Sequence, residues 1–290
     1  MTEIKQFKCV NCGAAANALY RTYGPTVLKL TKCESCKGIV DKYIEYDPVI
    51  VMIDLVLVSK EAQRHVLYNT EFKSYWKLLI ILTMLETYGV WYNNSLFNIV
   101  VNAVCGIEGS NSSPSIVSSA EGNSTFLNFA VNISLPDSWN ASCWAWNQEP
   151  KIENNDLFIW EKDFYIQFIS IFTGIAAYIL TLQILMRVMK SISVQSEVPL
   201  MRVLKAFSLA NVSILFTLPM LVWGNTDTSP DTRTVHYMLV FGYSFVVFLN
   251  IFTILYECPV LITAFILIMS NIAKYITSFH TTPQLRRLLS

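Results

Sequence analysis

Four long apolar stretches constrain the fold of this chain more than any other feature. A helix needs about 20 mostly apolar residues to cross a bilayer core of roughly 30 Å. The stretches cover residues 75–92, 164–186, 206–223 and 237 to about 272. Glu257, Cys258 and Pro259 interrupt the last one, which predicts either two short spans or one span followed by a re-entrant or surface segment. We therefore expect residues 75–290 to form an α-helical transmembrane bundle of about four to five spans.

The charge content agrees with a membrane region. Only 14% of the residues are charged, whereas soluble domains contain about one quarter. The 21 basic and 21 acidic residues cancel, so no bulk attraction to nucleic acid is expected. Two pairs of small residues at a spacing of four, Ser170/Gly174 and Ala206/Ala210, indicate faces on which helices pack.

Basic residues predict the orientation of the membrane region. The polar opening MTEIKQFKC indicates no cleavable signal peptide, so we expect the first span to act as the targeting signal. Four basic residues precede that span, and none follows it before Lys151; the four are Lys60, Arg64, Lys73 and Lys77. Because cytosolic flanks carry the excess of Lys and Arg, the N-terminus is predicted to lie in the cytosol.

The loop of residues 93–157 is polar and contains five N-x-[ST] sequons. Asn93 lies too close to the predicted bilayer, which leaves Asn111, Asn123, Asn132 and Asn140 as candidate N-glycosylation sites. The loop is therefore predicted to be lumenal and glycosylated; the alternative is a merely disordered polar loop. Cys105 and Cys143 also fall in the loop, where an oxidising lumen would permit a disulfide between them.

Four of the seven cysteines form two C-x-x-C pairs near the N-terminus: Cys9, Cys12, Cys33 and Cys36. The cytosol is reducing, which argues against disulfides, and a thioredoxin-type motif has one pair rather than two. Four soft thiolates at this spacing are the ligand set of a closed, structural Zn²⁺ site. Between the pairs, residues 18–23 and 26–30 are predicted to be strands joined at Gly24-Pro25, with residues 40–46 as a third strand. Residues 1–46 are thus predicted to form a small cytosolic zinc ribbon with four cysteine ligands.

Residues 47–74 connect this ribbon to the first span. Asp47 and Pro48 are a helix-start pair, and Val49–Val58 is apolar except for Asp54. The strip is too short to span a bilayer, and its β-branched residues are also compatible with a buried strand. We favour a helix lying in the membrane interface, with Val49, Ile50 and Ile53 toward lipid and Arg64 toward headgroups.

The sequence contains no phosphate loop, G-x-S-x-G or H-E-x-x-H motif, so no enzymatic activity is expected. Glu86 is the one acidic residue within a predicted span that suggests function. Its plainer interpretation is a carboxylate near the lumenal interface.

The run from CVNCG through CESCKGIVDKYIEYDPVIVMIDLVLVSKEAQRHVLYN, over residues 8–69, resembles the N-terminal homology domain of the ARV family. Weaker similarity extends to WEKDFYIQF and LPMLVW in later spans, whereas the insert at 105–155 departs from the family pattern. The resemblance implies a multi-pass endoplasmic-reticulum protein of sterol movement, sphingolipid homeostasis and glycosylphosphatidylinositol (GPI) anchor assembly. It also maps the family's zinc cysteines onto the two C-x-x-C pairs.

Two functions follow as expectations. The first is a non-enzymatic factor for intracellular sterol transport and sphingolipid homeostasis, whose partners are membrane lipids such as a sterol, a sphingolipid or a GPI intermediate. The second is an accessory or scaffold subunit of a GPI-anchor glycosyltransferase, whose partners are GPI-biosynthesis enzymes.

Overall fold

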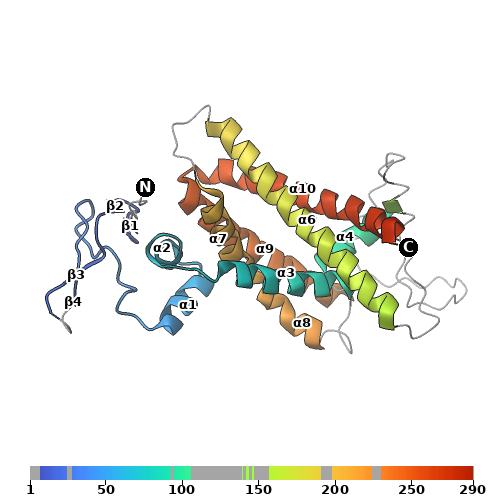
Figure 1. The fold of residues 1–290 in the computed structure, drawn as a ribbon, viewed down its shortest axis with the longest axis horizontal. Helices are drawn as coiled ribbons and strands as arrows, with labels where there is room; N and C mark the ends of the chain where they lie inside the picture. Colours follow the sequence, from blue (N-terminus) through green and yellow to red (C-terminus); the bar gives the residue numbers. More distant parts are fainter. Residues whose placement is uncertain are drawn as a thin grey trace, which may run out of the picture. The chain divides into compact units, whose positions relative to one another are not determined.

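The computed structural model describes residues 7–24, 28–92, 95–105, 139, 142–143, 146, 157–190, 198–223 and 230–289. Short β-strands come first, followed by helices to the end of the described chain (Figure 1). The chain divides into two compact units. Unit 1 comprises Met1–Ile81, Arg187–Ser213 and Tyr243–Leu267, and unit 2 comprises Leu82–Met186, Ile214–Gly242 and Ile268–Ser290.

Among the residues that the structure describes, four helical segments are long and apolar enough to cross a membrane, which confirms the predicted multi-span helical architecture. They lie in α6 (Leu157–Lys190), in the consecutive helices α7 (Leu200–Ala210), η2 (Asn211–Thr217) and α8 (Leu218–Trp223), in α9 (Pro230–Tyr256) and in α10 (Val260–Leu289). The first predicted span forms α3 (Tyr75–Trp91), whose 17 residues make it shorter than these four segments.

The structure decides how the long last stretch is divided. Glu257 ends α9 in the left-handed conformation, at φ 51°, and its N–H donates to the Thr253 carbonyl. Pro259 has no N–H to continue a helix, but its carbonyl accepts from Thr263 and so begins α10. Residues 237–272 therefore belong to two helices, α9 and α10, each long and apolar enough to cross a membrane.

The N-terminal region contains two antiparallel hairpins. Strands β1 (Phe7–Lys8) and β2 (Ala15–Ala16) pair, as do β3 (Tyr20–Thr22) and β4 (Leu28–Leu30). The second hairpin confirms the strands expected on either side of Gly24-Pro25. The third strand predicted over residues 40–46 is wrong: these residues form turns, because the buried Asp41 side chain accepts a hydrogen bond from the Tyr43 N–H.

The strip after the hairpins is helical rather than a strand. Helix α1 (Pro48–Val56) has Asp47 as its N-cap, whose carboxylate accepts from the Val49 N–H at 2.9 Å, and Pro48 as its first residue. A short helix, α2 (Lys60–Arg64), follows with Ser59 as its N-cap. The chain then continues into a π-helical turn, η1 (His65–Asn69), before α3 begins.

Small and hydroxylated residues join α6 to α10 within unit 2. The Ser170 hydroxyl lies 2.7 Å from the Thr282 hydroxyl and donates to the Ser278 carbonyl at 3.1 Å. A Cβ on Gly174 would clash with the Ser278 Oγ. The Ser170/Gly174 pair is therefore a helix-packing face, as its spacing predicts, and Ala206 and Ala210 are also fully buried.

Candidate metal centre

The two C-x-x-C pairs meet at one point in unit 1. All four Sγ atoms lie within 4.8 Å of one another. Cys9 Sγ is 3.8 Å from Cys36 Sγ, and Cys12 Sγ is 3.7 Å from Cys33 Sγ. A tetrahedron with metal–sulfur bonds of about 2.3 Å has sulfur–sulfur edges of about 3.8 Å, so the thiols are spaced for tetrahedral Zn²⁺. With four protein ligands no position is left for water or substrate, which restricts such a metal to a structural role.

The two cysteine turns repeat the same backbone pattern. The residue after the second cysteine of each pair, Gly13 and Lys37, has a positive φ of 80° and 61°. Its N–H donates to the carbonyl of the first cysteine, Cys9 or Cys33, at 2.9 and 3.0 Å. Glycine adopts this conformation readily, whereas Lys37 is an uncommon non-glycine case. The repetition brings both sulfurs of each pair to one side of their turn.

The electrostatic environment of the thiols differs within the cluster. Hydrogen bonding from the Cys36 N–H lowers the pKa of the Cys33 thiol to about 6. Burial raises the pKa of the Cys9 thiol to about 12. Because a metal binds the thiolate form, a bound cation would favour loss of the Cys9 proton.

The first cysteine turn is clamped by α2 and η1. Asn69 accepts from the Lys8 N–H at 3.0 Å and donates to the Lys8 carbonyl at 2.9 Å. Arg64 Nη1 donates to the carbonyls of Val10 and Asn11, both at 2.7 Å. Arg64 Nη1 thus binds the backbone between Cys9 and Cys12, and the expectation that Arg64 faces lipid headgroups stays a prediction.

A buried acid connects these clamps. Asp41 is 0% exposed, and its Oδ2 lies 2.6 Å from Asn69 Nδ2 and 2.7 Å from His65 Nδ1. His65 Nε2 is 3.0 Å from the Thr70 hydroxyl, so both ring nitrogens have partners. Such fully paired buried polar networks favour one arrangement over its alternatives. The network makes the cysteine cluster, α2 and η1 one structural module.

Helix α1 packs on this module with only part of its surface. Val51 and Leu55 contact the buried cluster of Val10, Tyr43 and Ala62. The Tyr43 hydroxyl donates to Asp54 at 2.7 Å, and burial raises the pKa of Tyr43 to about 12, so it stays a donor. The other side remains apolar and accessible: Val49, Ile50 and Ile53 are 60%, 43% and 53% exposed.

The structure also locates residues of the membrane region. Cys105, at the end of α4 (Leu96–Cys105), and Cys143 are joined in a disulfide. The candidate glycosylation sites Asn111, Asn123, Asn132 and Asn140 lie outside the described residues.

Glu86 has a partner that sequence reasoning missed: Lys274 Nζ lies 2.5 Å from its Oε1, with both side chains largely buried. The residues are 188 positions apart, so no local pattern could have paired them.

The fold and the cysteine cluster define a class: a helical membrane protein with a small four-cysteine module at its N-terminal end. Within that class, the chain belongs to the Arv1-like family, whose model matches residues 8–248.

Several members of the family are similar to this chain over part of its length. Protein ARV1 of Homo sapiens is 46% identical over 87 residues, which cover 30% of this chain and 32% of the human protein. Protein ARV 2 of Arabidopsis thaliana is 37% identical over 87 residues, or 28% and 38% of the two chains. Protein arv1 of Schizosaccharomyces pombe is 34% identical over 90 residues, or 29% and 34%. The chain thus matches about one third of the length of these relatives, and no solved structure matches it.

Proposed function

We propose that this chain is a non-enzymatic endoplasmic-reticulum membrane protein for intracellular sterol transport and sphingolipid homeostasis, linked to GPI-anchor assembly. The observation that carries the proposal is its membership of the Arv1-like family over residues 8–248. Four helices able to cross a membrane support a protein that works on or among lipids.

We also propose that Cys9, Cys12, Cys33 and Cys36 hold one structural Zn²⁺. The sulfur spacing supports this choice, and so does the size of the head, because about 45 residues bury too little apolar surface to be stable alone. Bound zinc would cross-link the two cysteine turns. Arg64 and Asn69 would then orient the first turn from outside the ligand shell.

The exposed side of α1 is proposed to lie in the membrane interface. Fully burying a Val or Ile side chain stabilises by about 1.5–3 kcal/mol, so an accessible row of three such residues has a strong drive to leave water. Lys60, which follows α1, is exposed and could meet anionic headgroups.

For topology, we propose a cytosolic N-terminus and a lumenal loop over residues 93–157, as the charge distribution predicts. The end of α10 would then be lumenal too, since Trp139, Cys143 and Trp146 of that loop pack with Phe279. Arg286 near this end would then be a basic residue on the lumenal side, where the positive-inside rule disfavours it. Its ion pair with Asp163, at 3.0 Å, offsets that charge.

Reconstitution tests the proposed activity. The purified full chain in donor liposomes should accelerate movement of a fluorescent sterol to acceptor liposomes. Ile53→Asp, on the accessible side of α1, should reduce that rate, whereas Tyr23→Asp in the ribbon hairpin should not. No acceleration by the wild-type chain over protein-free liposomes would contradict sterol transport.

One feature favours the second candidate, an accessory subunit of a GPI-anchor glycosyltransferase. The β3–β4 hairpin exposes Tyr20, Tyr23 and Leu28, and aromatic residues on a surface are typical of protein contacts. Copurification of such an enzyme with wild-type chain, and its loss with Tyr23→Asp, would support the scaffold over the transporter.

A further inference from the structure

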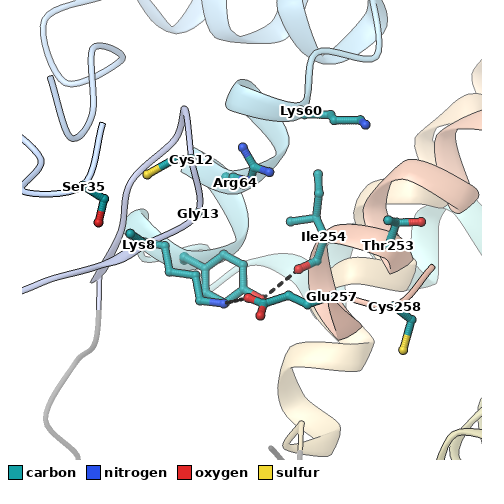
Figure 2. A pocket seen from close by; sticks show the side chains of 12 residues that line it. Lys8, Cys12, Gly13, Ser35, Lys60, Arg64, Thr253, Ile254, Glu257 and Cys258 are labelled. Atoms are coloured by element: carbon teal, nitrogen blue, oxygen red, sulfur yellow. Dashed lines mark hydrogen bonds and ion pairs between the residues drawn. The ribbon is translucent and has the colours of Figure 1, made fainter. Parts of the chain in front are cut away.

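A pocket lies beside the cysteine cluster in unit 1, at the break between α9 and α10 (Figure 2). Its volume is about 560 Å³, within the range of roughly 300–1,000 Å³ typical of small-molecule sites. The first cysteine turn, α2, η1 and the end of α9 provide its walls. Neither zinc binding nor sterol transport requires such a pocket.

The pocket offers charges of both signs. Lys8, Lys60 and Arg64 line it together with the carboxylate of Glu257. Figure 2 shows Arg64 and Lys60 extending from α2, while Lys8 reaches Glu257 at the end of α9. Zinc on four thiolates would add a formal charge of −2 behind Cys12, so the surroundings would not be strongly cationic. This balance favours a zwitterionic ligand over a bare anion.

Arg64 presents a preorganised edge for a phosphate. Its Nη1 is occupied by two backbone carbonyls, whereas Nε and Nη2 have no hydrogen-bond partner among the described residues. A Cβ built on Gly13 would be almost equidistant from Nε, Cζ and Nη2, at 3.8, 3.9 and 3.9 Å. The guanidinium therefore lies face-on against Gly13, and its Nε/Nη2 edge makes no hydrogen bond in the described part of the chain. That edge is the fork that binds two oxygens of a phosphate in parallel.

Lys60 adds a second cation to the lining of the pocket. It lies one helical turn before Arg64 on α2, is exposed, and forms no ion pair in the part of the chain that the structure describes. Unlike Arg64, its side chain makes no hydrogen bond to the ribbon backbone in that part of the chain, so Lys60 can be changed without removing the clamp on the cysteine turn.

Glu257 provides the opposite charge. Its side chain is 59% exposed, and among the described residues only Lys8 engages it, at Oε1. Lys8 is itself held over the Tyr68 ring, 4.4 Å from the centroid. The left-handed backbone at Glu257 fixes where this carboxylate leaves the end of α9. The second carboxylate oxygen of Glu257 can accept hydrogen bonds from a primary ammonium. A quaternary ammonium has no N–H and cannot donate such bonds.

We infer that this pocket binds a phosphoethanolamine headgroup, with the phosphate on Arg64 and Lys60 and the ammonium on Glu257. The same chemistry occurs in an ethanolamine phospholipid and in free phosphoethanolamine. The inference does not depend on sterol transport.

The test uses the full chain in nanodiscs of phosphatidylcholine mixed with either phosphatidylethanolamine or phosphatidic acid. Native mass spectrometry counts the lipid retained, and calorimetry measures binding of free phosphoethanolamine and inorganic phosphate. We expect phosphatidylethanolamine to be retained over phosphatidylcholine. If calorimetry also detects binding of free phosphoethanolamine, the headgroup alone suffices. If phosphatidylethanolamine is retained but free phosphoethanolamine does not bind, the ligand is the phospholipid.

Three variants and a control give the expected pattern. Lys60→Ala should weaken retention about three- to fivefold, and Glu257→Gln should remove an ethanolamine-over-choline preference of about fivefold. Arg64→Lys keeps the positive charge but loses the two parallel N–H donors of the guanidinium, and should weaken retention of phosphatidylethanolamine about tenfold. Lys29→Ala removes the same charge as Lys60→Ala from the exposed strand β4 and should change nothing.

Either of two results would overturn the inference. One is equal retention of the ethanolamine and choline lipids by the wild-type chain. The other is tighter binding of phosphatidic acid and inorganic phosphate that improves further in Glu257→Gln, because the pocket would then be a simple anion site.

Discussion

The isosteric change Asn69→Asp tests whether the buried network holds the first cysteine turn. Asn69 donates to the Lys8 carbonyl and to Asp41, and an aspartate of the same shape can donate to neither. Losing a neutral bond costs about 0.5–1.5 kcal/mol and losing one to a charged group about 1.5–3 kcal/mol, or about 2–4 kcal/mol together. Asn69→Ala loses the same two bonds and also the bond from the Lys8 N–H, which adds about 0.5–1.5 kcal/mol.

The aspartate adds a second cost, because it places two buried carboxylates where a 2.6 Å hydrogen bond was. One of the two carboxylates can take up a proton. At pH 7 this costs up to about 4 kcal/mol, because each pH unit above the ordinary aspartate pKa of about 3.9 costs about 1.4 kcal/mol. The folded variant then binds a proton that the unfolded chain does not, so its stability should rise as pH falls. The alanine variant should lack that pH dependence.

Hydrogen exchange of the peptide that contains Cys9–Ala14 measures the free energy of local opening directly. Its amides are protected by the Cys9–Ala14, Val10–Val40 and Gly13–Cys9 backbone bonds. At pH 7, exchange should accelerate roughly 70- to 10,000-fold in Asn69→Ala, and Asn69→Asp should exchange faster than wild type by an amount that shrinks as pH falls. The double change Asp41→Asn with Asn69→Asp restores one donor–acceptor contact and should recover part of the loss. Equal exchange in all variants, or no pH-dependent difference between Asp and Ala, would refute the reasoning.

Three further outcomes are expected. Metal analysis of the purified chain should find about one Zn²⁺, and Cys9→Ser or Cys36→Ser should abolish it, since three thiolates bind far more weakly; a metal-free wild-type chain would contradict this. Ile50→Asp with Ile53→Asp should weaken protection of α1 from an aqueous quencher in proteoliposomes without changing exchange at the cysteine turns. Gly174→Leu should lower the thermal stability of the detergent-solubilised chain by separating α6 from α10, because its Cβ position clashes with the Ser278 side chain; unchanged melting would count against that packing.

The sequence predicted those features whose signals are local. The two C-x-x-C pairs, the Asp47-Pro48 helix start and the length of the apolar stretches are each contained in a short window, and the structure has the cysteine cluster, α1 and four long helices. The same windows misread residues 40–46, whose alternation resembles a strand. Asp41 turns inward there to meet partners 24 and 28 residues away, and that requirement overrides β-propensity.

What the sequence could not reveal are partners that only the fold brings together. Asn69 reaches Lys8 across 61 residues, and Lys274 reaches Glu86 across 188. Arg64 is an informative case: as a cation near an apolar helix, it has the composition of a headgroup contact. Its Nη1 also binds two carbonyls in the cysteine turn, a role that no sequence pattern displays.

These long-range partners connect the cysteine cluster to the ends of the helices in unit 1. Lys8 directly precedes Cys9, and the same residue is clamped by Asn69 and pairs with Glu257 at the end of α9. Tyr68, next to Asn69, places its hydroxyl 3.3 and 3.4 Å from the carbonyls of Ile254 and Leu255 in the last turn of α9. A change in the first cysteine turn is therefore expected to reach the end of α9 by two routes. One runs through Lys8 to Glu257, and the other runs through Lys8 and Asn69 to Tyr68. If zinc holds that turn, removing the metal should increase exchange not only around Cys9 but also at the α9–α10 break, and an unchanged break would mean that the two are not coupled.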